Sequence, residues 1–221
     1  MPTFGQEKFN FDGLFTLEMA NNHQGSLEHG KRIIREAAAA VKEHGVRAAV
    51  KLQLRDLDSF IHPSFRERKD VKHIPRFLST RLSREEFREL VEETRRAGLY
   101  TMATPFDEPS VDFLVSLGVE IVKVASCSAQ DWPLLEKVAG AGKPIVVSVG
   151  GLSVKETDRV VSFFEHRGAQ FALMHCVAVY PTPTDQFSLG FVETMKSRYP
   201  HLTVGFSTHE APSDTATVGL A

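Results

Sequence analysis

Side chains that could do chemistry recur inside or directly after apolar stretches of this chain. The first case is LEMANNHQGS at residues 17–26, where the carboxylate of Glu18 lies in an apolar stretch that ends in amides and a histidine. Lys51 and Lys123 also lie inside short apolar runs, VKLQ and IVKV. Such positions are typical of strands whose polar side chains line a site rather than solvent.

Two lysines in these positions would suit an anion, most simply a phosphate or a carboxylate. Ser126 and Ser207 also follow apolar runs and could donate hydrogen bonds to the same anion. A single lysine at a strand end can simply extend to solvent. The pair Lys51 and Lys123 therefore carries the prediction of an anion site.

Other candidates have structural alternatives. His175 in LMHCV fits a hydrogen-bonded core histidine, and Cys127 and Cys176 fit buried, inert thiols. His209, beside Glu210, is a better candidate for a metal ligand, although one histidine is weak evidence for a metal site.

The elements that must position these residues alternate regularly. Short stretches rich in Val and Ile predict strands, and longer amphipathic stretches predict helices. The predicted strands are 14–20, 47–53, 99–105, 120–126, 144–150, 171–177 and 202–208. The predicted helices are 27–43, 83–97, 108–116, 131–140, 153–167 and 188–198.

This alternation predicts parallel βαβ units and an α/β fold, a (β/α)8 TIM barrel with seven units visible and the eighth missing from the chain. The first strand–helix turn has no Gly-x-Gly-x-x-Gly pattern, which argues against a doubly wound dinucleotide fold. We expect an amino-terminal extension, 1–13, and a barrel domain, 14–221, truncated at its carboxyl end. The segment 54–82 predicts a long functional or flexible connection, and 211–221 the start of a seventh helix.

Local signals mark the helix boundaries. Ser83 with Glu86, and Ser153 with Glu156, have the spacing of a capping box. Glycines follow four of the predicted helices, where a left-handed residue ends a helix. They are Gly98, Gly118, Gly142 and Gly168.

The composition excludes several classes of partner. The formal net charge of -2 provides no basic face for nucleic acid, and no apolar run approaches the roughly 20 residues of a membrane span. With only two cysteines and no signal-peptide pattern, we expect a cytoplasmic protein.

Several motifs together resemble the barrel domain of the sialic acid (N-acetylneuraminate) synthase family, including its spore-coat polysaccharide branch. They are EMANNHQG, VKLQ, TPFDEPSVDFLVSLGV, VKVAS, DWPLLEKVAGAGKPIVVSVG, HCVAVYPTP and VGFSTHE, in this order. The resemblance runs from about residue 14 to the end.

The resemblance implies that phosphoenolpyruvate condenses with the aldehyde of N-acetylmannosamine or a related sugar and releases phosphate. It places phosphate and carboxylate binding on a set of lysines and hydroxyls, namely Lys51, Thr104, Lys123, Ser126 and Ser207. Glu18 falls on the position that handles protons. Gln53 and Tyr180 match positions that line the substrate site. The resemblance makes Glu18, Lys51 and Tyr180 the catalytic residues. Asn22 and His23 match the first-strand pattern and would shape the mouth.

His209 matches one of two histidines that hold a divalent metal, usually Mn2+. The second histidine is expected beyond residue 221, as is a small carboxy-terminal domain that covers the sugar site of a partner in a homodimer. Three departures from the family pattern limit the inference, and the first two should weaken recognition of the standard N-acetylated sugar. Ser128 replaces a carboxylate, Ala178 replaces an asparagine, and Thr208 and Glu210 replace the residues that usually flank the metal histidine. A different aldose or amino-sugar acceptor is therefore expected.

Two other functions stay open on the sequence. A metal-dependent sugar isomerase or aldolase would use the same barrel without a site for phosphoenolpyruvate. A degenerate homologue would bind sugar phosphates without catalysis, which Ser128 and Ala178 would allow. The enzyme is favoured by four retained residues: Glu18, Lys51, Lys123 and His209.

Overall fold

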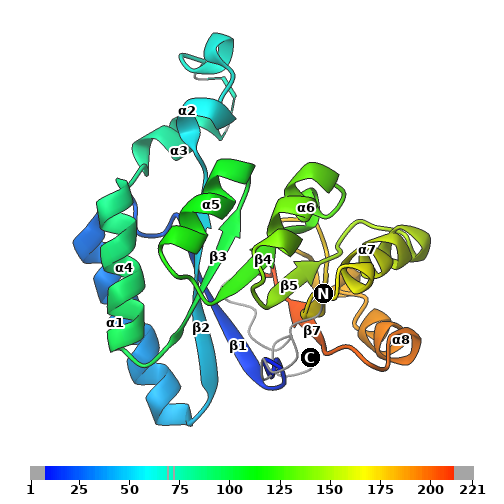
Figure 1. The fold of residues 1–221 in the computed structure, drawn as a ribbon. Coiled ribbons are helices and arrows are strands. Elements are labelled where there is room, and N and C mark those ends of the chain that lie inside the picture. The colour runs from blue at the N-terminus through cyan, green and yellow to red at the C-terminus, as the bar shows by residue number, and fades with distance from the viewer. Residues whose placement is uncertain (1–7, 69, 72, 212–221) are drawn as a thin grey trace. The chain divides into compact units, whose positions relative to one another are not determined.

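The computed structural model of the protein describes residues 8–68, 70–71 and 73–211, in which strands and helices alternate along the chain (Figure 1). The strands are β1 (Leu14–Ala20), β2 (Arg47–Leu54), β3 (Tyr100–Pro105), β4 (Ile121–Val124), β5 (Ile145–Ser148), β6 (Phe171–Cys176) and β7 (Val204–Ser207). The α-helices are α1 (Leu27–His44), α2 (Leu57–Phe60), α3 (Ile74–Ser79), α4 (Arg84–Arg96), α5 (Glu108–Ser116), α6 (Trp132–Gly140), α7 (Val154–His166) and α8 (Gly190–Arg198). Short 3-10 turns are η1 (Pro63–Phe65), η2 (Ser126–Ser128) and η3 (Thr184–Gln186).

The strands follow one another in the sheet in chain order, from β1 to β7 within the described residues. Every strand pairing that the structure describes is parallel. This strand order, with a helix after each of the first six strands, confirms the predicted α/β fold of the barrel type. The helix expected from 211 onward lies almost wholly outside the described residues.

The boundary signals also hold. Ser83 and Ser153 both form complete capping boxes, with Glu86 and Glu156 respectively. The four glycines expected to end helices all adopt positive φ, between 62° and 76°. These local signals explain why the predicted element bounds lie close to the observed ones.

The chain divides into two compact units: an amino-terminal unit, residues 13–122, and a carboxy-terminal unit, residues 123–211 with the segment up to Asp12. In the amino-terminal unit β1, β2 and β3 pair in register, and Lys51 on β2 lies opposite both Glu18 on β1 and Met102 on β3. The register shifts between Glu18 and Ala20, and Ala20 adopts a φ of 45°. The bulge lies at Met19, and the pairing with β2 resumes at Ala20, the last residue of β1.

The connection after β2 is folded, not structureless. It contains α2, η1 and α3, held by a small apolar cluster of Leu57, Ile61 and Ile74 against which Val71 and Phe77 pack. No helix was predicted there from the sequence. The two helices have only 4 and 6 residues, too short to show a helical period, and the cluster supplies stability that short isolated helices lack.

In the carboxy-terminal unit β5, β6 and β7 pair in parallel. The segment before β1 belongs to this unit: the backbone of Phe9 donates to Gln170 Oε1 at 2.7 Å, and Thr203 donates to Asp12 at 2.8 Å. Gln170 and Thr203 directly precede β6 and β7, so Phe9 and Asp12 of the predicted extension lie at the amino ends of these strands.

Candidate active site

Glu18 and Lys51 form the first pair of the site in the amino-terminal unit. They lie opposite each other on β1 and β2 and make an ion pair. The Lys51 side chain is only 12% exposed, whereas that of Glu18 is 42% exposed. The ammonium group is therefore enclosed, and the carboxylate reaches the open side, where it could exchange a proton with a bound substrate.

Gln53 and Thr104 form a second pair, one step nearer the carboxyl ends of the strands. They lie opposite each other on β2 and β3, and Gln53 is on the same face of β2 as Lys51 because side chains alternate along a strand. Thr104 is 2% exposed, and its hydroxyl has no hydrogen-bond partner among the residues that the structure describes. An unpaired buried hydroxyl costs about 1–3 kcal/mol, so this position favours a ligand oxygen.

The amide of Gln53 has a defined orientation. Arg55 donates from both terminal nitrogens to Gln53 Oε1, each at 3.1 Å. Because a guanidinium group only donates, the contacted atom must be the amide oxygen. The amide nitrogen of Gln53 is then the end that can donate to a substrate hydroxyl or carbonyl.

The residues that follow β1 differ in their exposure to solvent. His23 is buried and packs edge-to-face on Phe87, whereas Asn22 is exposed. Asn21, to which the sequence assigns no role, lines a pocket together with His23 and Gln53. Of the two residues predicted to shape the mouth, the structure encloses His23 and leaves Asn22 at the surface.

Lys123 is the central cation of the carboxy-terminal unit. It is 4% exposed, and its Nζ donates to Ser148 Oγ at 2.5 Å and to the Val124 carbonyl at 2.8 Å. An enclosed ammonium group at this strand end is suited to contact an anionic ligand. Ser148 ends β5, a position that the sequence marks as polar without giving it a role.

Ser126 and Ser207 lie at strand ends in the same unit. Ser126 opens η2 directly after β4, two residues past Val124, and Ser207 is the last residue of β7, opposite Cys176 on β6. Both are partly exposed, which leaves their hydroxyls within reach of a ligand.

His209 and Tyr180 are neighbours beyond β6 and β7. Their ring centroids are 4.1 Å apart, and Tyr180 is exposed. His209 Nδ1 lies 2.8 Å from the Val177 carbonyl, which fixes the proton on Nδ1 and the lone pair on Nε2. Histidines that bind metals commonly donate their other ring N–H to a backbone carbonyl in this way. Within the described part of the chain, however, no group of three or more His, Cys, Asp or Glu side chains could hold an ion.

Two of the alternative interpretations have clear outcomes. His175 is a core histidine, buried with Nε2 2.8 Å from the Phe187 carbonyl and its ring against Phe191 and Phe206. Cys176 is a buried free thiol, as predicted, but Cys127 is exposed and that prediction was wrong. The reason is that β4 ends at Val124, so Cys127 lies on η2 instead of inside a strand.

No helix among the described residues is long and apolar enough to cross a membrane.

Comparison with known proteins relates the chain to one family. The NeuB family model matches residues 35–221. The N-acetylneuraminate-9-phosphate synthase of Drosophila melanogaster is 30% identical over 203 residues, which are 87% of this chain and 53% of that protein. The chain thus spans about half the length of the curated relatives it matches.

Solved structures agree. A candidate spore coat polysaccharide biosynthesis protein E from Chromobacterium violaceum is 46% identical with a TM-score of 0.92, over 95% of this chain and 62% of that one. A truncated 3-deoxy-D-arabino-heptulosonate 7-phosphate synthase from Thermotoga maritima, 16% identical with a TM-score of 0.62 over 90% of this chain and 66% of that one, shares the fold alone.

Proposed function

Because the chain belongs to the NeuB family, we propose that it takes part in a phosphoenolpyruvate-dependent condensation with a sugar aldehyde. The product would be a sialic-acid-like 2-keto sugar acid for surface polysaccharide biosynthesis. The relatives named as N-acetylneuraminate-9-phosphate synthase and spore coat polysaccharide biosynthesis protein support this reaction class.

The observation that carries the proposal is the buried Lys123 at the end of β4. Its ammonium group is held by Ser148 Oγ at 2.5 Å, which fixes a positive charge at the carboxyl end of a strand, where barrel active sites lie. A phosphoenolpyruvate phosphate or carboxylate is the type of anion that an ammonium group at this position would bind, with Ser126 and Ser207 as further donors.

In the reaction, C3 of phosphoenolpyruvate forms a carbon–carbon bond to the aldehyde carbon, whose oxygen takes up a proton. The oxygen of water adds to C2 and phosphate leaves from C2, so one water is consumed for each phosphate released. We assign proton transfer at the sugar oxygen or the water to Glu18, whose carboxylate is exposed while its partner Lys51 is enclosed. Thr104, with its buried hydroxyl, would donate to an anionic oxygen.

His209 is suited to bind a divalent metal, most simply Mn2+, through Nε2, because Nδ1 is committed to the Val177 carbonyl. When bound, such an ion supplies Lewis-acid polarisation of the aldehyde. Ser128 and Ala178 stand where the family resemblance expects a carboxylate and an asparagine, so neither provides the side chain that would recognise the standard N-acetylated acceptor. We therefore infer an acceptor other than free N-acetylmannosamine. Two free cysteines are in accord with a cytoplasmic location.

The test is phosphate release by the purified full-length protein, supplied with phosphoenolpyruvate, Mn2+ and a panel of aldoses. We expect release only when a sugar is present. Glu18→Gln should lower kcat by about 100-fold or more, since it removes a general acid–base group, and should leave phosphoenolpyruvate binding within about threefold.

The matched control is Glu43→Gln, an exposed carboxylate on α1. It should turn over like the wild type. Full turnover by Glu18→Gln would remove Glu18 from the mechanism. Sugar conversion without phosphate release would show an isomerase or aldolase instead, and binding without any conversion would show a degenerate homologue.

A further inference from the structure

Arg55 directly follows β2, and the segment after β3 holds the backbone on both sides of it. The Leu54 carbonyl accepts a hydrogen bond from the Phe106 N–H at 3.1 Å, and the Asp56 N–H donates to Asp107 Oδ2 at 2.8 Å. Asp107 is also the N-cap of α5, where its other carboxylate oxygen accepts from the first turn of that helix. The backbone of Arg55 is therefore tied to the adjoining strand end and helix.

Three aromatic rings surround the guanidinium group of Arg55. Its central carbon lies 3.7 Å from the ring centroid of Phe106, 4.3 Å from that of Phe77 and 6.0 Å from that of Phe60. Phe77 belongs to α3 and Phe60 to α2, and these two rings also pack edge-to-face on each other. The folded connection between β2 and α4 thus supplies two of the three rings that hold the cation in place.

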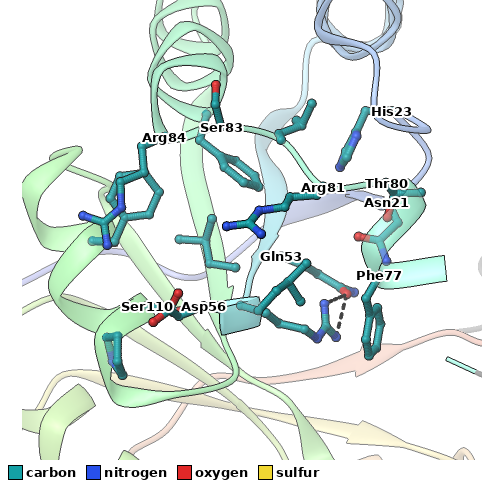
Figure 2. Close-up of a pocket in the computed structure, with 17 residues that line it drawn as sticks. Asn21, His23, Gln53, Asp56, Phe77, Thr80, Arg81, Ser83, Arg84 and Ser110 are labelled. Carbon is teal, nitrogen blue, oxygen red and sulfur yellow. Dashed lines mark hydrogen bonds between the residues drawn. The ribbon is translucent and has the colours of Figure 1, made fainter. Parts of the chain in front are cut away.

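The guanidinium group held in this way is directed at Gln53. Both terminal nitrogens donate to Gln53 Oε1, each at 3.1 Å, and Figure 2 shows these two bonds as dashed lines with the Phe77 ring beside them. Gln53, Arg55 and Phe77 all line a pocket of about 140 Å³. A glutamine amide can present either its oxygen or its nitrogen to a ligand, and here Arg55 determines which end is available.

Stacking on the rings would suffice to anchor the connection to the sheet. The two hydrogen bonds are additional, and they end on a side chain of the site. Gln53 lies on the same face of β2 as Lys51, two residues further along the strand. Arg55 therefore joins the aromatic cluster to a residue that faces the chemistry.

We propose that Arg55 is a positioning residue for recognition of the acceptor sugar. It fixes the Gln53 amide so that the NH2 group is the end that meets the sugar. The inference rests on the proposed function, because the partner of that NH2 group would be the acceptor of the reaction. The sugar group beside Gln53 is then an oxygen with a lone pair, a hydroxyl or a carbonyl, and a group that can only donate hydrogen bonds is disfavoured there.

The experiment is a double-mutant cycle in the phosphate-release assay. It uses the full-length protein and the fastest acceptor of a panel of mannose, mannosamine and N-acetylmannosamine. Gln53→Ala should raise KM for the sugar about tenfold, the effect of losing one hydrogen bond. Arg55→Met keeps a long apolar side chain without a donor, and it should raise this KM by a similar factor. The double variant should be no worse than Gln53→Ala, because Arg55 acts through Gln53. KM for phosphoenolpyruvate should stay within about threefold in all three variants.

The matched control is Arg47→Met. Arg47 is the first residue of the same strand, and its guanidinium group lies 5.7 Å from the ring centroid of Tyr100. It offers a similar stacked arginine at the amino end of β2, away from Gln53. Both KM values should be unchanged in this variant.

Three results would overturn the inference and leave the proposed function standing. The first is an unchanged KM for the sugar in either single variant. The second is an effect of Arg55→Met that is as large in the Gln53→Ala background as in the wild type. The third is an equal rise of both KM values in Arg55→Met, which would show a merely structural role.

If no sugar of the panel releases phosphate, the proposed function fails, and the role of Arg55 is judged by NMR. The side-chain amide signals of Gln53, assigned by their loss in Gln53→Ala, should shift in Arg55→Met and stay in place in Arg47→Met. Such a shift would keep Arg55 as the residue that positions Gln53. Signals unmoved by Arg55→Met would remove that role.

Discussion

Thr104 shows how a single residue can separate a functional role from a structural one. Its hydroxyl is buried on β3 without a hydrogen-bond partner in the described residues. On the same strand Thr101 is equally buried, but its hydroxyl donates to Glu120 Oε2 at 2.9 Å and accepts from the Glu120 backbone at 3.0 Å. The two threonines therefore form a natural comparison.

We predict that Thr104→Val changes the free energy of unfolding by less than about 1 kcal/mol, because no bond in the free protein is lost. It should raise KM for phosphoenolpyruvate about tenfold, since the ligand loses a donor. Thr101→Val should do the reverse, losing about 1–3 kcal/mol of stability with KM unchanged. Urea unfolding and steady-state kinetics check both. A Thr104→Val variant with unchanged KM would show that the hydroxyl serves no ligand.

Much of the candidate site at this scale could be predicted from sequence. An ionic residue inside a short apolar run has few environments available, so Glu18, Lys51 and Lys123 could be picked out without a structure. Three features of the site could not be predicted from the sequence: the unpaired Thr104 hydroxyl, the contact of Lys123 with Ser148, and the hydrogen bonds from Arg55 to Gln53. Each depends on which side chains the fold brings within hydrogen-bonding distance.

The bounds of most helices follow from local sequence signals, and each element that was predicted wrongly has a physical cause. The helices with capping residues and terminal glycines begin and end close to the predicted residues. The segment between β2 and α4 was not predicted as helical because α2 and α3 depend on a tertiary cluster of Leu57, Ile61 and Ile74. Strand ends were predicted too long at β4 and β5, where the strands stop at Val124 and Ser148 to form turns.

The turn after β5 requires a glycine for space, not for φ. A Cβ on Gly150 would lie 2.4 Å from Cys176 Sγ and 2.6 Å from the Cys176 carbonyl oxygen. Because the carbonyl belongs to the backbone of β6, it cannot rotate away. We predict that Gly150→Ala destabilises the protein by about 1–3 kcal/mol, the usual cost of overpacking.

Gly140, at the end of α6, is the control for this substitution, since a Cβ there would meet nothing within 4 Å. Gly140→Ala should be neutral or stabilise by up to about 1 kcal/mol through helix propensity. Thermal unfolding of both variants measures the two stability changes and tests whether Gly150→Ala destabilises the protein while Gly140→Ala does not. A Gly150→Ala variant as stable as the wild type would mean that β5 and β6 can move apart at this position.

At the scale of the whole molecule, the parallel strand order follows from the regular alternation of strand and helix patterns. The family is likewise established across most of the chain. The acceptor, the metal and the predicted homodimer remain predictions, because the chain spans about half of its curated relatives. Glu18, the residue proposed for proton transfer, belongs to the amino-terminal unit, and the buried Lys123 belongs to the carboxy-terminal unit.

The central claim is that a phosphoenolpyruvate anion is bound by Lys123. Calorimetric titration of the purified full-length protein with phosphoenolpyruvate, with and without Mn2+, tests it most directly. We predict saturable binding that Lys123→Met removes and that Lys155→Met, at an exposed position on α7, leaves intact. Circular dichroism would verify that each variant is folded. Equally tight binding by folded Lys123→Met, or no binding by the folded wild-type protein, would contradict the account.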